Sequence, residues 1–182
     1  MTKYFVKIAS SVVALVVVAL LLVLVVSDPN EGQVARSPLL GQPAPSVVST
    51  TIDDEPFVLE RRKGSWVVLN FFNSTCVPCI NEHPLLVEFE RREASNPNRA
   101  ELYTVVNDDS DDAVREFFSQ NGGTWPKLRD DNGAIAVAFG VARVPETWII
   151  DPNGVVRLRV VGELSEGLLE RQLDTLREEF TS

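Results

Sequence analysis

The sequence contains very few of the residues that build disulfide scaffolds or metal sites. It has 182 residues but only two cysteines, Cys76 and Cys79, and one histidine, His83. A disulfide scaffold would show four or more cysteines spread along the chain. A structural zinc site needs four ligands, more than these three residues supply. We therefore expect no metal and no other cofactor, and we interpret His83 as a structural or solvated residue.

Basic residues are outnumbered by acidic ones. The chain has 17 Lys and Arg against 26 Asp and Glu, which gives a net charge of −9 at pH 7. An acidic surface repels the phosphate backbone, so we exclude nucleic acid as a partner. The same charge argues against a domain that lies flat on anionic lipid.

Charge is absent from residues 8–27, which are mostly Val, Leu and Ala. A helix of this length rises about 30 Å, the thickness of the hydrocarbon core of a bilayer. Lys3 and Lys7 precede the stretch, so the positive-inside rule keeps the N-terminus in the cytoplasm. A cleaved signal peptide is the alternative, but residues 25–27 make a poor small-x-small cleavage site. We expect residues 1–27 to form an uncleaved anchor that spans the cell membrane once, with the rest of the chain exported.

The composition changes after this apolar stretch. Residues 28–45 are rich in Pro, Gly and polar side chains, which indicates a linker. Residues 46–182 are long enough to form one domain with its own hydrophobic core.

Strand and helix patterns alternate along residues 46–182. The predicted strands are residues 47–51, 57–59, 66–72, 102–106, 147–151 and 155–161. The predicted helices run from the cysteines to about residue 93 and over residues 111–120, 133–139 and 166–180. Strands that alternate with helices pair in parallel, and the last two strands form an antiparallel hairpin. The predicted fold is therefore α/β, with a mixed central sheet flanked by helices and an N-terminal hairpin extension.

The two cysteines form a C-x-x-C pair between a buried strand and a helix. A pair this close shuts a very small loop, which removes little entropy from the unfolded chain and disfavours a structural disulfide. A helix N-terminus stabilises a thiolate and lowers its pKa. We therefore predict a redox couple in which Cys76 attacks disulfides and Cys79 resolves the mixed disulfide.

A proline begins the strand at residues 147–151. Pro145 follows Val144, and an X-Pro bond in such a place can be cis. If this loop faces the cysteines, the backbone before Pro145 can pair with an incoming peptide strand. An ordinary trans proline at a strand start is the alternative.

Three segments together resemble the TlpA/ResA/CcmG (DsbE) group of thioredoxin-like proteins. NFFNSTCVPCINEHPLL resembles the group's strand, active-site turn and first helix. WPKLRDDNGAIAVAFGVARVPETWIIDPNGVV resembles its later helix, cis-proline loop and hairpin, and LLGQPAPSV resembles its lead-in. This combination is far more specific than C-x-x-C alone. The resemblance implies a thioredoxin-like fold, a cis peptide bond at Pro145 and a kink at Pro84 in the active-site helix.

The resemblance also implies how protons are handled near the cysteines. Asn70 occupies the place where thioredoxins carry a buried Asp, and because Asn is not a base, another group must take the proton. Glu82 and Glu146 are the candidates, since the group's reducing members have an acidic active site. A carboxylate near Cys79 would disfavour its thiolate and could accept its proton. The alternative for Glu82 is a solvated side chain on the helix surface.

The chain departs from the group at two places. Thr75 stands where the group usually has Trp, so the exposed aromatic that helps to hold a substrate is either missing or supplied by Phe72 or Trp148. The dipeptide Val77-Pro78 between the cysteines is a signature of no single member. The identity of the substrate therefore stays open.

The leading prediction is an extracytoplasmic thiol–disulfide reductase. As the resemblance implies, it acts on exported protein thiols and disulfides, such as the haem-attachment cysteines of apocytochrome c. Exported compartments are oxidising, so a reductant there needs continual recharging. The resemblance assigns that task to a membrane thiol carrier of the CcdA or DsbD type.

Three alternatives remain. A general oxidase or isomerase of exported proteins would use the same cysteines. A thiol peroxidase needs Thr three residues before its reactive cysteine, where this chain has Asn73. A Sco-like copper-delivery protein needs C-x-x-x-C and a distant histidine, but here the spacing is one residue shorter and His83 lies near the pair.

Overall fold

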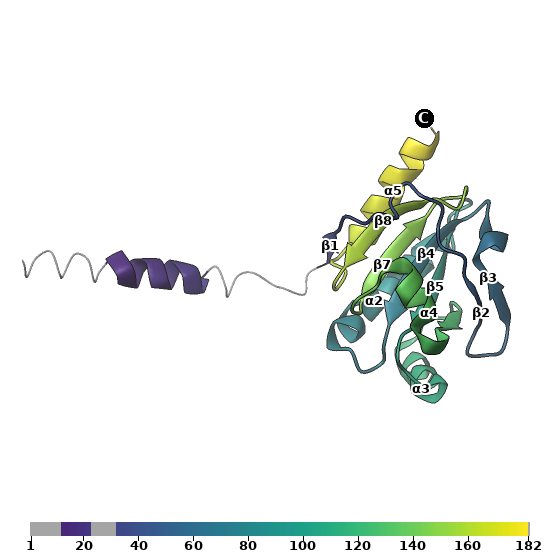
Figure 1. The fold of residues 1–182 in the computed structure, drawn as a ribbon, viewed down its shortest axis with the longest axis horizontal. Helices are drawn as coiled ribbons and strands as arrows, with labels where there is room; N and C mark the ends of the chain where they lie inside the picture. Colours follow the sequence, from purple (N-terminus) through teal and green to yellow (C-terminus); the bar gives the residue numbers. More distant parts are fainter. Residues whose placement is uncertain (1–11, 23–31, 182) are drawn as a thin grey trace, which may run out of the picture. The chain divides into compact units, whose positions relative to one another are not determined.

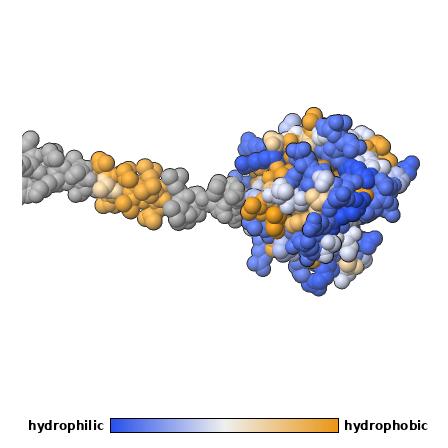
Figure 2. All heavy atoms as spheres, turned by 90° about the horizontal axis from the view of Figure 1, so that it is seen from below, coloured by the Kyte–Doolittle hydropathy of each residue, from blue (hydrophilic) through white to orange (hydrophobic). Residues whose placement is uncertain are grey.

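The computed structural model describes residues 12–22 and 32–181, which belong to two compact units. Residues 12–22 are helical, and their large apolar side chains are exposed (Figure 2). Within the described residues, no helix has the length and apolar character that a membrane crossing requires. The anchor predicted over residues 8–27 extends at both ends into residues that the structure does not describe.

The second unit is built on a six-stranded sheet in the order β1-β8-β7-β4-β5-β6 (Figure 1). Its strands are β1 Gln33–Val34, β4 Trp66–Phe72, β5 Ala100–Val106, β6 Lys127–Arg129, β7 Glu146–Ile150 and β8 Val156–Val161. β5 is parallel to β4 and β6, whereas β7 is antiparallel to β4 and β8. The mixed sheet is therefore confirmed. A separate antiparallel pair, β2 Val48–Thr50 and β3 Pro56–Val58, forms the predicted N-terminal hairpin.

Helices cover both faces of this sheet. They are α2 Val77–Glu93, α3 Asp111–Asn121, α4 Ala134–Phe139 and α5 Leu168–Thr181, with short 3-10 helices η1 Leu59–Arg62 and η2 Asp131–Gly133. One hydrophobic cluster joins α2, α3 and α5 to the sheet, and a second joins α4 and β3 to its opposite face. All seven residues of β4 are buried between the two clusters, which explains the uninterrupted apolar sequence of this strand.

Two strands of the sheet are absent from the predicted set. β6 has only three residues, two of them charged, and it is held by pairing with the edge of β5. β1 has only two residues, which pair with β8. Strands this short carry no readable alternation, so pairing with a neighbour, and not their own sequence, defines them.

The predicted linker of residues 28–45 also differs from the structure. From Gly32 onward the chain belongs to the second compact unit, and residues 28–31 lie outside the described residues. After β1 the chain follows the outer edge of β8, where the Gly41 amide donates to the Val156 carbonyl at 2.8 Å. The Pro and Gly content reflects an irregular strap whose backbone bonds go to β8, and the domain begins earlier than residue 46.

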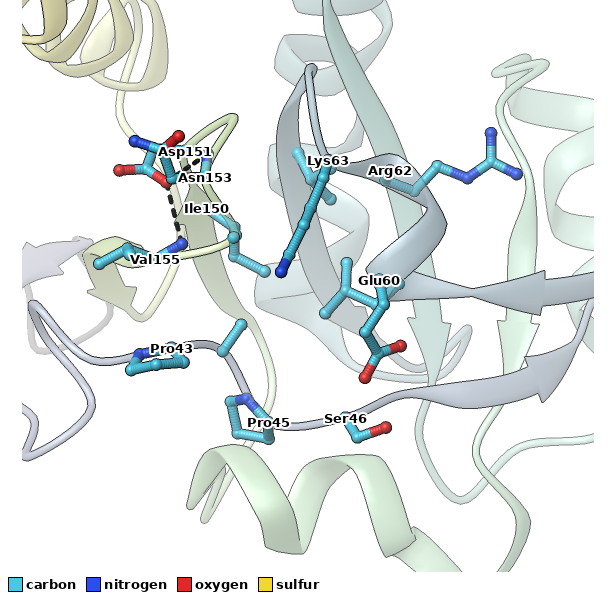
Figure 3. Close-up of a pocket in the computed structure, with 14 residues that line it drawn as sticks. Pro43, Pro45, Ser46, Glu60, Arg62, Lys63, Ile150, Asp151, Asn153 and Val155 are labelled. Carbon is cyan, nitrogen blue, oxygen red and sulfur yellow. Dashed lines mark hydrogen bonds between the residues drawn. The ribbon is translucent and has the colours of Figure 1, made fainter.

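A cavity of about 330 Å³ lies between this strap, η1 and the turn from β7 to β8 (Figure 3). Val67 at the start of β4 and Ile150 at the end of β7 contribute to its lining. The C-x-x-C turn follows the opposite end of β4, so this cavity and the cysteines lie at opposite ends of the sheet.

Candidate active site

The C-x-x-C turn connects the buried end of β4 to the first turn of α2. Cys76 is the N-cap residue of α2, and its Sγ accepts the Cys79 amide hydrogen at 3.4 Å. Both cysteines are free; Cys76 is half-buried and Cys79 is fully buried. A reagent can therefore reach Cys76 more easily than Cys79, which suits the predicted order of attack by Cys76 and resolution by Cys79.

Burial governs the acidity of the inner thiol. It raises the pKa of Cys79 far above its usual range, and the contact with Cys76 and the nearby Glu82 carboxyl raise it further. A thiol with such a high pKa reacts slowly at neutral pH unless a nearby base takes its proton. The resolving step at Cys79 therefore requires a proton acceptor.

The loop before β7 lies against the outer thiol. The Val144–Pro145 peptide bond is cis, as the resemblance implied. The Cys76 thiol donates to the Val144 carbonyl across 3.7 Å, so this backbone lies beside the reactive sulfur. The carbonyl of Pro145 in turn accepts the Gly162 amide hydrogen at 3.0 Å.

Glu82 is fully buried in α2. Its Oε1 accepts from the Asn70 side-chain amide at 2.7 Å, and its Oε2 accepts from the Leu164 backbone amide at 2.8 Å. Burial outweighs these two hydrogen bonds and raises the pKa of Glu82 to about 8. The solvated alternative for Glu82 is therefore wrong, and both protonation states of this carboxyl are accessible close to neutral pH.

Asn70 projects from β4 toward the same buried carboxyl. Its side-chain amide donates to Glu82 and also to Thr147 Oγ1 at 3.1 Å. Its Oδ1 is buried and, within the described part of the chain, has no hydrogen-bond partner. Asn70 thus orients the acid and leaves an acceptor free beside it.

Glu146 does not share this site. Side chains alternate along a strand, and Thr147 faces Asn70 and α2, so Glu146 projects to the other face of the sheet. There both of its oxygens accept from Arg159, at 2.8 and 2.9 Å. The prediction that Glu146 handles protons for Cys79 is therefore corrected: its carboxylate lies on the face away from α2 and is occupied by an ion pair.

The exposed aromatic side chain is missing as well. Phe72 and Trp148 are almost completely buried, so neither replaces the Trp for which Thr75 stands. The large apolar side chains exposed next to the reactive cysteine are Val77 and Ile80. A partner peptide therefore meets a small aliphatic surface at this position.

His83 is a core residue. Its ring packs against Phe117 and Phe118, and its Nε2 lies 3.0 Å from the Gly122 carbonyl. Burial lowers the pKa of His83, which favours the neutral ring. Over residues 12–22 and 32–181, no cluster of three or more His, Cys, Asp and Glu residues is placed to hold a metal ion.

Asn73 and Asp109 fix the active-site turn through side-chain contacts that were not predicted from the sequence. The Asn73 side-chain amide donates to the carbonyls of Asn107 and Asp108, and its Oδ1 accepts from the Thr75 amide and hydroxyl. The Asp109 carboxylate accepts the Ser74 amide hydrogen at 2.6 Å. The sequence does carry a signal for this Asx turn: Asn73 follows directly after a strand and stands two residues before Thr75, a polar residue of the turn.

Known proteins share sequence similarity with this chain. A family model described as Redoxin matches residues 39–176. The thiol:disulfide interchange protein HelX of Rhodobacter capsulatus is 31% identical over 153 residues, which cover 82% of each chain. The thiol-disulfide oxidoreductase ResA of Bacillus anthracis is 31% identical over 134 residues, covering 74% of this chain and 76% of ResA.

Solved structures show the same likeness. A structure described as a putative thiol:disulfide interchange protein DsbE from Chlorobium tepidum superposes with a TM-score of 0.68 at 25% identity, covering 75% of this chain and 96% of that one. The structure of MTB dsbF superposes with a TM-score of 0.65 at 27% identity, covering 71% and 94%.

Proposed function

Because this chain belongs to the Redoxin family and is a thiol–disulfide oxidoreductase, we propose that it acts as a reductase of exported protein disulfides. The observation that carries the proposal is the buried pair of Cys79 and Glu82. Strong disulfide oxidants gain their oxidising power by stabilising the reduced, thiolate form. Here burial and a neighbouring carboxyl raise the pKa of Cys79, so this thiol stays protonated and the reduced form gains no stabilisation from a Cys79 thiolate.

The first step takes place at the exposed sulfur. The Cys76 thiolate attacks one sulfur of the substrate disulfide, the substrate S–S bond breaks, and the released sulfur takes up a proton. A mixed disulfide then joins Cys76 to the substrate. The Val144 carbonyl beside Cys76 offers a backbone acceptor to the extended peptide that carries the substrate cysteine.

The second step uses the buried groups. Cys79 gives its proton to ionised Glu82, and the new thiolate attacks Cys76 Sγ. The mixed disulfide breaks and the substrate leaves as a second thiolate, which is then protonated. The substrate has gained two electrons and two protons, and the protein is left with a Cys76–Cys79 disulfide that a dithiol donor must reduce.

The sequence supports a proposal for the location and the partners of the reaction. An anchor at residues 8–27, with the N-terminus in the cytoplasm, would hold the domain outside the cytoplasm at the cell membrane. There a membrane thiol carrier of the CcdA or DsbD type would supply the electrons. The resemblance to the TlpA/ResA/CcmG group favours the haem-attachment cysteines of apocytochrome c as substrate, which makes cytochrome c maturation the process served.

Trapping of the mixed disulfide tests this function. In cells, full-length Cys79→Ala protein cannot resolve the adduct, so partners with paired cysteines should accumulate on Cys76. The Cys76→Ala/Cys79→Ala variant is the matched control and should trap none. A reduction potential close to that of strong oxidants, together with adducts of newly exported proteins that need disulfides, would instead support the oxidase alternative.

A further inference from the structure

The first described residue of the domain lies very close to the loop that follows β8. The Gly32 amide donates to the Glu163 carbonyl. A Cβ atom added to Gly32 would lie 2.5 Å from that carbonyl oxygen and 3.1 Å from the Val160 side chain. The surroundings of Gly32 therefore leave no space for a side chain.

The loop after β8 contacts both the active-site helix α2 and the loop that contains Pro145. The Leu164 amide donates to Glu82 Oε2 at 2.8 Å, and Glu163 Oε2 accepts from the Asn81 side chain at 3.2 Å. One residue earlier, the Gly162 amide donates to the Pro145 carbonyl. Movement of residues 162–164 would therefore shift the donor that faces the buried acid.

We propose that Gly32 is a positioning residue for the thiol exchange reaction: its close backbone contact with Glu163 holds the Leu164 amide on the Glu82 carboxylate. The strap that carries the chain into the domain is then part of the active-site framework. This inference rests on the proposed role of Glu82 as proton acceptor for Cys79. It extends that role to a residue far from the cysteines in sequence.

Displacement of the Leu164 amide should raise the pKa of Glu82. The groups that face Glu82 are Asn70 from β4, the Leu164 amide and the Glu163 carboxylate from the loop, and Cys79 from its own helix. The Leu164 amide stabilises the ionised carboxylate, whereas Glu163 opposes it. Loss of a hydrogen bond to a charged group raises the pKa of Glu82 by about one pH unit. The ionised fraction at pH 7 then falls about tenfold, and resolution by Cys79 slows by the same factor.

Gly32→Val in the full-length protein in detergent tests this coupling. The matched control is Gln33→Val, which adds the same side chain at the next, exposed position of β1. Single turnover with an aromatic disulfide such as 5,5′-dithiobis(2-nitrobenzoate) releases one chromophore on Cys76 attack and a second on Cys79 resolution. We expect Gly32→Val to slow the second release about tenfold at pH 7 and to move its pH midpoint up by about one unit, with the first release unchanged.

Titration of the Glu82 carboxyl carbon by NMR gives a readout that does not depend on activity. If Gly32→Val folds and leaves both this titration and the second release as in the control, the proposal is wrong, even where its thermal midpoint falls. If Gly32→Val does not fold, Gly32→Ala decides, because a Cβ alone meets the Glu163 oxygen. If Glu82→Gln leaves the rate of the second release unchanged, Glu82 is not the proton acceptor of Cys79. The NMR titration of Glu82 in Gly32→Val still tests whether Gly32 positions the Leu164 amide.

Discussion

The side-chain amide of Asn70 in β4 donates to the carboxyl of Glu82 in α2 across 2.7 Å, in a place where neither residue is exposed. Glu82 follows Cys79 by three residues, so the two side chains share one face of the helix. The sheet thus orients the carboxyl of Glu82 near the buried Cys79 thiol of the same helix. Because Asn70 carries no charge, Glu82 is the residue of this pair that can exchange a proton with Cys79.

Replacement of Glu82 by Gln should separate the two steps of thiol exchange. Without the carboxylate the pKa of Cys79 falls, because a negative charge that opposes its thiolate is gone. The proton acceptor is also lost, so the second chromophore release should slow by about 10²-fold, within the usual contribution of general base catalysis. Glu88→Gln, on the exposed side of the same helix, is the matched control and should leave both steps unchanged. Equal thiol titrations and rates in the Glu82 variant and the wild type would contradict the role of this acid.

The same residue should make stability depend on pH. The pKa of Glu82 is about 8 in the folded protein against an ordinary value of 4.5. Between these values the folded state holds a proton that the unfolded state has lost, so stability falls as pH rises. The contribution is full below about pH 4.5 and is lost as pH rises through about 8; its size is on the order of a few kcal/mol. Urea unfolding of wild type and Glu82→Gln checks this dependence. From pH 5 to pH 9 the unfolding free energy of the variant should rise relative to that of the wild type by about a few kcal/mol. A difference between the two proteins that is constant with pH would contradict the raised pKa.

The sequence predicted most of the sheet because its central strands carry strong patterns. β4 occupies residues 66–72, as expected, since an uninterrupted apolar run at this length fits a strand buried on both faces. β1 and β6 were not predicted, because two- and three-residue strands depend on their neighbours and not on their own residues. The strap before residue 46 resembled a linker for the same reason: its backbone, and not its side chains, attaches it to β8.

Within the site, residues near the cysteines in sequence were easier to predict than long-range partners. Glu82 lies three residues after Cys79, so helix periodicity alone places it near the thiol. Glu146 was misplaced because strand alternation and the pairing with Arg159 become decisive only once β7 and β8 are aligned. The contact of Leu164 with Glu82 spans 82 residues, and backbone donors carry no sequence signal.

Arg159→Met should show that the Glu146 carboxylate stabilises the fold, whereas the Glu82 carboxylate takes part in thiol exchange. The substitution leaves the buried Glu146 carboxylate without its ion-pair partner and should cost about 3–5 kcal/mol of unfolding free energy, measured in urea. The second variant, Glu146→Leu/Arg159→Met, removes both charges and should recover most of that loss. Both proteins should release the two chromophores at wild-type rates under native conditions. A selective slowing of the second release would restore Glu146 as a proton handler.

Asn73→Ala should slow attack by Cys76 without unfolding the domain. The Asn73 side chain ties the turn to the carbonyls of Asn107 and Asp108 and accepts from Thr75, so its loss frees the segment that sets the position of Cys76. A reacting sulfur held less firmly loses rate through orientation, and we expect the first chromophore release to fall about tenfold.

The matched control for this prediction is Asn96→Ala. Asn96 makes the same local contact as Asn73 does with Thr75: its Oδ1 accepts the Asn98 amide hydrogen at 2.9 Å, but Asn96 follows the far end of α2. Asn73→Ala should lose more stability than Asn96→Ala, because Asn73 makes four hydrogen bonds, two of them to carbonyls 34 and 35 residues away, whereas the Asn96 bond joins residues two apart. Only Asn73→Ala should slow the first release. If both variants slow it equally, the effect comes from general loosening of the domain and the positioning role of Asn73 is wrong.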